Sequence, residues 1–153
     1  MKYFLITIAI LLLCSGCSYQ NAFSKFDMTQ KEELLASNTQ SSKITSKESV
    51  EGIVTAIYLN NIDENYVDGY ENFIVGVYMK DSTLKYDFKL NRELPINMEK
   101  IEDLNDYKEV LKSPKKWDTY YYVKFKNYGK KIDFTLESDI LSSALLHYLK
   151  DPR

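Results

Sequence analysis

Alternating apolar and polar positions in the last two-thirds of the chain predict a β-rich domain. From Val50 onward, β-branched and aromatic residues recur with a period of two. Segments 50–59 and 73–79 are apolar at nearly every position and therefore suit central strands that are covered on both faces. Three further segments alternate and predict strands with one solvated face. They are 84–90, 117–125 and 132–136.

Short polar turns between these segments favour antiparallel neighbours, because a tight turn cannot join two parallel strands. Residues 80–83 and 127–130 are expected to close two hairpins, and residues 60–69 read as a polar loop. The expected fold class is therefore mainly β (α+β), either an antiparallel β-sandwich or a sheet with a C-terminal helix.

Helical spacing predicts two short helices in this domain. One covers 104–111, where Asp103 can cap the start and Ser113-Pro114 can stop the helix. The other is the C-terminal helix, which would lay an apolar face on the sheet. Its apolar positions are Ile140, Leu141, Ala144, Leu145, Tyr148 and Leu149.

The N-terminal third has a different pattern. Residues 3–13 form an uncharged apolar run, too short for a bilayer core, which needs roughly 20 residues, but typical of a signal-peptide core. The polar stretch 17–49 is predicted to be a tether, and its single periodic piece suggests a short helix with capping-box spacing of Thr29 and Glu32. The domain would then span 50–153, unless Ile44 already begins the first strand.

The sequence 13–17 (LCSGC) resembles the lipobox of bacterial lipoproteins, in which a Leu-like residue and two small residues precede a Cys. The last three positions match, and Cys14 stands where Leu is usual. The resemblance implies that residues 1–16 are a signal peptide and that Cys17 is acylated, which anchors the chain to a membrane of the cell envelope. Because Ser18 is not Asp, enteric-type sorting implies the outer membrane, facing the periplasm.

A second, local resemblance involves residues 118–122 (DTYYY), which are similar to the Asp-Thr-x-x-Tyr run of strand F in immunoglobulin domains. Those domains carry a core Cys two residues after the Tyr, whereas this chain has Lys124, and the alternation turns Tyr122 outward. An immunoglobulin-like sandwich therefore rests on the number of strands rather than on this match.

Candidate catalytic chemistry is sparse. His147 is the only histidine, and it falls on the expected C-terminal helix. Loss of Cys14 with the signal peptide and acylation of Cys17 would leave no thiol for Cys–His catalysis. No GxSxG elbow and no Gly-rich phosphate loop are present. We therefore expect no catalytic residues and no enzyme activity.

Metals, cofactors and nucleic acids are not expected as partners either. The loop 60–72 is rich in acidic and amide side chains, but Val67 and Asp68 break the EF-hand spacing that starts at Asp63. One histidine is a poor basis for a zinc site. The 20 Lys and Arg nearly balance the 22 Asp and Glu, so no basic excess attracts nucleic acid.

Tyrosine is the feature that suggests a binding role, with 13 copies in the chain. Tyr120 and Tyr122 fall on the polar-facing side of their strand if Trp117, Tyr121 and Phe125 point inward, and Tyr128 lies in a turn. Exposed tyrosines at these three positions would suit a partner protein. The alternative is cross-strand aromatic pairing that only stabilises the sheet.

The expected function is a non-enzymatic, membrane-anchored lipoprotein that binds another envelope protein or assists an assembly. The alternative is a periplasmic lipoprotein that binds a small ligand or a glycan.

Overall fold

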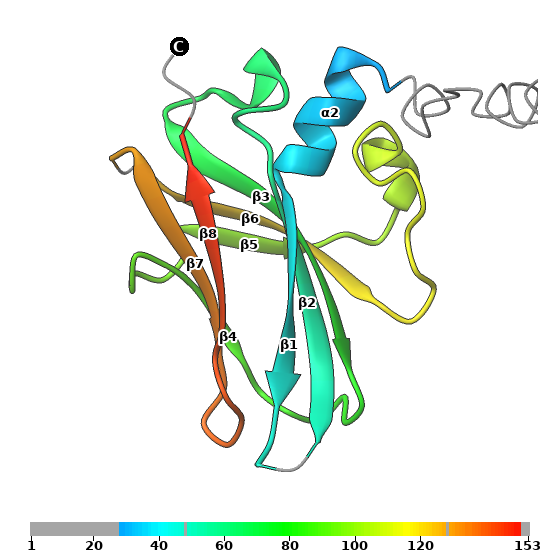
Figure 1. Ribbon diagram of the computed structural model, residues 1–153, viewed down its shortest axis with the longest axis vertical. Helices are drawn as coiled ribbons and strands as arrows, with labels where there is room; N and C mark the ends of the chain where they lie inside the picture. The colour runs from blue at the N-terminus through cyan, green and yellow to red at the C-terminus, as the bar shows by residue number, and fades with distance from the viewer. Residues whose placement is uncertain (1–27, 48, 128, 151–153) are drawn as a thin grey trace, which may run out of the picture.

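Two antiparallel sheets pack face to face in the computed structural model, which describes residues 28–47, 49–127 and 129–150 (Figure 1). The expected signal peptide 1–16, Cys17 and Tyr128 lie outside these residues. The five-stranded sheet has the order β1 (Thr39–Thr45), β2 (Val50–Tyr58), β3 (Tyr70–Met79), β6 (Thr119–Lys126), β5 (Asn97–Lys100). The three-stranded sheet has the order β4 (Asp87–Leu90), β7 (Lys131–Glu137), β8 (Ala144–Leu149). The sandwich expected from the sequence is confirmed.

The main core fills the space between the sheets, because every second residue of each strand points inward. Its centre is aromatic: Phe73 of β3 has its ring centroid 5.0 Å from that of Tyr58 and 5.2 Å from that of Phe134 on the opposite sheet. Both Phe73 and Phe134 are completely buried. The period-two pattern therefore predicts correctly which strand residues face the core.

A second apolar cluster covers part of the outer face of the five-stranded sheet. The helix α2 (Gln30–Ser37) and the short 3-10 turns η3 (Glu64–Tyr66) and η4 (Leu104–Tyr107) supply its cover. Ile57 and Ile74 from the sheet pack there with Leu111. Half of β2 and β3 is consequently buried on both faces, as their continuous apolar runs indicate.

The two long sides of the sandwich differ. On one side, β1 and β8 are joined: Gln40 uses its side-chain amide to bond the backbone N–H and C=O of His147, and Ser142 N–H donates to Thr45 O (2.9 Å). On the other side, β4 and β5 are the outermost strands of their sheets. The sandwich therefore has one closed side and one open side.

The short N-terminal helix is confirmed, capping box included. Thr29 Oγ1 accepts from Glu32 N–H (3.3 Å), and Glu32 Oε2 accepts from Thr29 N–H (2.8 Å). Lys112 donates to the other oxygen of Glu32. This bond from Lys112, followed by those from Thr29, lowers the pKa of Glu32 to about 2.

We expect Glu32→Gln to make the free energy of unfolding depend less on pH under acid conditions. A carboxyl whose pKa is depressed by folding stabilises the fold above its unfolded pKa of about 4.5, and this contribution is lost as the pH falls toward about 2. The wild type should therefore gain free energy of unfolding between about pH 2 and 4.5 more steeply than E32Q, measured by urea titration. Glu33→Gln, an exposed neighbour in the same helical turn, is the control. Identical slopes in wild type and E32Q would contradict the assignment.

Several local predictions are wrong. The C-terminal helix is the strand β8, whose burial alternates strictly as it pairs with β7 over six positions. The helix predicted over 104–111 is only the turn η4. The two expected hairpins are wrong as well. The strands on either side of 80–83, β3 and β4, belong to different sheets, and so do β6 and β7 on either side of 127–130.

The polar tether predicted over 17–49 is also wrong within its described part. Residues 39–45 form β1, which pairs along β2 and buries Ile44 completely. Its outward side chains are polar because β1 is an outermost strand whose outer face is largely solvated. The alternative, in which Ile44 begins the first strand, is right that a strand starts before Val50 but wrong about its start, which is Thr39.

Candidate functional site

The tyrosines expected to form an exposed surface are packed into the fold. Tyr120 is only 8% exposed and stands over Gly76, where an added Cβ would lie 2.8 Å from its ring. Its hydroxyl accepts from Lys115 N–H (2.8 Å). Tyr122 is half-buried and donates to Asn72 Oδ1 (2.7 Å). The expectation of exposed rings is wrong at these positions because the second apolar cluster covers this face.

Trp117 was expected to be buried, but it is exposed. The alternation placed it inward, but β6 begins at Thr119, and the Trp117 side chain is 67% exposed. Tyr121 and Phe125 do face the core, as predicted. A large aromatic ring therefore lies on the surface immediately before β6.

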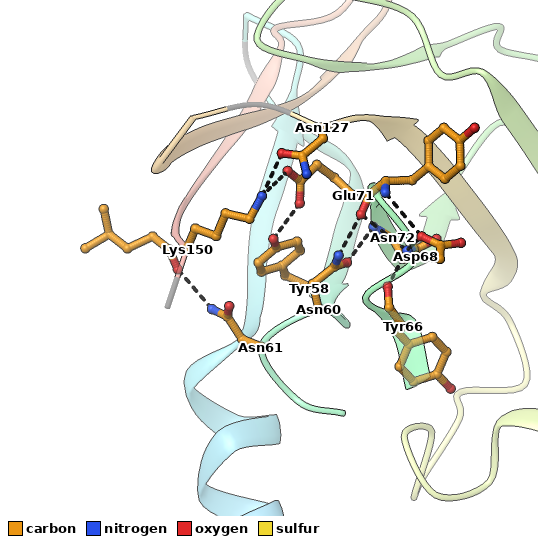
Figure 2. A network of polar contacts seen from close by, with 11 residues as sticks. Tyr58, Asn60, Asn61, Tyr66, Asp68, Glu71, Asn72, Asn127 and Lys150 are labelled. Carbon is orange, nitrogen blue, oxygen red and sulfur yellow. Dashed lines mark hydrogen bonds and ion pairs between the residues drawn. The ribbon is translucent and has the colours of Figure 1, made fainter. Parts of the chain in front are cut away.

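A buried polar network occupies the end of the sandwich where β2 ends and β3 begins (Figure 2). Glu71 of β3 is completely buried. Tyr58 Oη donates to its Oε2 (2.6 Å), and Lys150 Nζ donates to its Oε1 (2.7 Å). Lys150 also donates to Asn127 Oδ1 (2.8 Å). The lysine that follows β8 thus neutralises a carboxylate inside the sandwich.

Asn72 forms the other half of the network. Its backbone N–H donates to Asn60 Oδ1 (2.8 Å), and its Nδ2 donates to Tyr66 O (2.7 Å) and Asp68 Oδ1 (2.9 Å). Asp68 in turn accepts from Lys124 Nζ (2.7 Å). The loop between β2 and β3 is therefore bound to the sheet through side-chain amides.

Asn61 connects this end of the sandwich to α2. Its Nδ2 donates to Asn38 Oδ1 (2.8 Å) at the end of the helix and to Leu149 O (2.9 Å) of β8. The sequence predicted only a polar loop over 60–69, and this network was missed. The available signal was the polar pair Asn60-Asn61 directly after the mostly apolar segment 50–59.

The chemistry of the network favours a structural role. Burial raises the pKa of Tyr122 to about 12, so its phenol stays a proton donor to Asn72 at neutral pH. Lys150 offsets the charge of Glu71, and the adjoining cavity measures only about 160 Å³. Such a network fixes the ends of strands, because a buried polar group without a partner would be costly.

His147 lies on a strand rather than on a helix. It is on the outer face of β8, and its Nδ1 is 2.7 Å from Asp133 Oδ1 on the neighbouring strand β7. Within the part of the chain that the structure describes, no three His, Cys, Asp or Glu side chains gather in a way that could hold a metal ion. His147 and Asp133 thus form a cross-strand surface pair.

The open side of the sandwich carries a row of exposed apolar residues. Leu94, Ile96 and Met98 are 61%, 46% and 51% exposed, along β5 and the segment that leads into it. Met98 lies opposite Val123, which is completely buried, so the apolar face of the sheet continues onto β5 beyond its cover. This is the most apolar exposed strand edge that we find in the described residues.

The backbone of β5 is also available for pairing. Ile101 N–H donates to Tyr120 O on β6 (2.9 Å), and bonding alternates along an antiparallel strand. The backbone groups of Glu99 therefore face β6, and those of Met98 face away from it. An outermost strand with outward-facing backbone groups and apolar side chains can accept a further strand.

Comparisons with known proteins give no relative. No protein-family model, no curated protein and no solved structure matches the chain. In the residues that the structure describes, no helix has both the length and the apolar composition to cross a membrane.

Proposed function

We propose that this protein is a lipid-anchored, non-enzymatic module of the bacterial cell envelope that binds another envelope protein. The lipobox-like sequence ending at Cys17 supports the anchor, and Ser18 after it supports the outer membrane. The observation that carries the binding role is the open edge at β5 with its exposed apolar row. We therefore propose Leu94, Ile96 and Met98 as the binding surface instead of the tyrosines.

The partner that fits this edge is an extended segment of another protein, added antiparallel or parallel beside β5. Strand addition combines backbone hydrogen bonds with pockets for alternate side chains. The outward backbone groups of Met98 would supply the bonds, and the apolar row would supply the contact area. An anchored domain that presents such an edge can hold a partner close to the membrane.

Crosslinking tests the surface. A photoreactive residue at Ile96 is expected to give a discrete crosslinked protein in cells, whereas the same residue at Leu145, which is equally exposed (46% against 47%) on the other sheet, should not. Adding Met98→Pro should remove the crosslink, because proline lacks the outward N–H yet is tolerated at an edge position. Equal crosslinking at both positions, or a crosslink that survives Met98→Pro, would contradict strand addition.

The anchor has its own test. Metabolic labelling with a fatty-acid probe should mark the wild type and spare Cys17→Ser, because the sulfur of Cys17 is the proposed acceptor. Loss of the anchor should also release the protein from washed membranes. Labelling of both proteins, or of neither, would count against lipidation.

A further inference from the structure

A hollow of about 310 Å³ opens on the outer face of the five-stranded sheet, beside the second apolar cluster. Its floor is one row of residues that lie opposite each other across four strands. The row is Ser41, Thr55, Gly76 and Tyr120. Because Ser41 and Thr55 are short and Gly76 has no side chain, the floor lies low between the strands, and the segment 110–115 forms a wall.

The floor offers hydroxyl groups that can both donate and accept. Ser41 Oγ and Thr55 Oγ1 are 2.8 Å apart, and either can be the donor. Each hydroxyl has one proton and two lone pairs, so this pair keeps capacity for a ligand. Hydroxyl–hydroxyl pairing of this kind suits a partner that is itself rich in hydroxyls.

A carboxylate lies at the β6 end of the hollow. Asp118 lines it, and its nearest side-chain partner is Tyr120 Oη at 3.4 Å, a long hydrogen bond. Among the described residues, no Lys, Arg or His nitrogen lies within 4 Å of this carboxylate. Partial burial raises the pKa of Asp118 from its ordinary value, which indicates that water only partly solvates it. A ligand hydroxyl would restore strong hydrogen bonding there.

Apolar surface completes the lining. Ile57, Ile74 and Leu111 contribute to it, together with the ring of Tyr120 over Gly76. A sugar ring presents C–H groups on its faces and hydroxyls around its edge, so it matches a site with both aromatic and hydroxyl surfaces. A purely apolar ligand would leave the hydroxyls and the carboxylate desolvated without partners.

We infer that this hollow is a carbohydrate-binding site in which Asp118 and Thr55 bond ligand hydroxyls and the apolar lining contacts the C–H face of a sugar ring. An extended peptide is disfavoured because this is a sheet face, without the free backbone groups of an edge. The site lies on another surface than β5, so it goes beyond the proposed protein-binding role and can fail or succeed independently of it.

The single tryptophan of the chain provides a local readout. Full-length protein, kept in a detergent without a sugar headgroup, would be titrated with maltotriose, cellotriose and chitotriose, following Trp117 fluorescence and confirming binding by calorimetry. At least one trisaccharide is expected to give a saturable signal. Asp118→Asn should raise its Kd at least tenfold, and Thr55→Val several-fold.

Matched controls lie on the outer face of the three-stranded sheet. Asp133→Asn and Thr135→Val remove the same chemical groups from residues that are also half-buried, and they should leave the Kd within twofold. Circular dichroism would establish that each variant is folded. No saturable signal with any of the three sugars, or unchanged affinity in both D118N and T55V, would overturn the inference. The hollow and β5 are separate surfaces, so Met98→Pro should not alter sugar binding. A negative sugar titration would therefore leave the β5 proposal unaffected.

Discussion

Replacing Lys150 by methionine is expected to destabilise the fold by about 2–4 kcal/mol, because it removes a hydrogen-bonded cation from the buried carboxylate of Glu71. The side chain of Lys150 is 27% exposed, so water that enters in its place keeps the cost below that of a fully enclosed pair. Urea unfolding of the full-length protein measures the change. The midpoint should fall while the slope stays constant.

A second lysine supplies the comparison. Lys124 contacts Asp68 at the same distance, 2.7 Å, but that carboxylate is 39% exposed rather than buried. Lys124→Met should therefore cost no more than about 1 kcal/mol. Adding Glu71→Gln to the Lys150→Met variant should recover most of the loss, because the neutral amide still accepts from Tyr58 Oη. Equal effects of the two lysine substitutions would show that burial of Glu71 does not set the cost.

The elements that sequence reasoning predicts well are those whose pattern is imposed by the core. In β7, the inward positions Ile132, Phe134 and Leu136 alternate with polar residues, and all three are completely buried. The capping box at α2 is similarly local, since Thr29 and Glu32 recognise each other across three residues. Both signals can be recognised within a few consecutive residues, without knowing which distant residues they contact.

The missed strands are those at the edges. β1 and β5 bury few side chains, so their sequences contain little of the apolar alternation that marks a strand. β8 illustrates the opposite problem. Its residues Ala144–Leu149 fit period two as well as helical spacing, and only pairing with β7, through contacts that the local pattern does not contain, decides for the strand.

The environment of Tyr120 and of the polar network depends on still more distant residues. Tyr120 is buried because segments before β1 and between β5 and β6 cover its face, and alternation along β6 carries no information about that cover. Glu71 finds its cation 79 residues later, at Lys150. A sequence can show that these side chains exist, but their partners follow from the topology.

The aromatic centre gives the second large effect: Phe73→Ala is expected to cost about 3–5 kcal/mol in free energy of unfolding. Phe73 is completely buried, and its ring lies within 6 Å of the rings of Tyr58, Phe125, Phe134 and Tyr148, so truncation opens a cavity between both sheets. Phe73→Leu, which refills most of that volume, should cost clearly less. Chemical denaturation of both variants measures the difference. If alanine and leucine were equally tolerated, the ring would not hold the sheets together, and the closed side through β1 and β8 would have to do so.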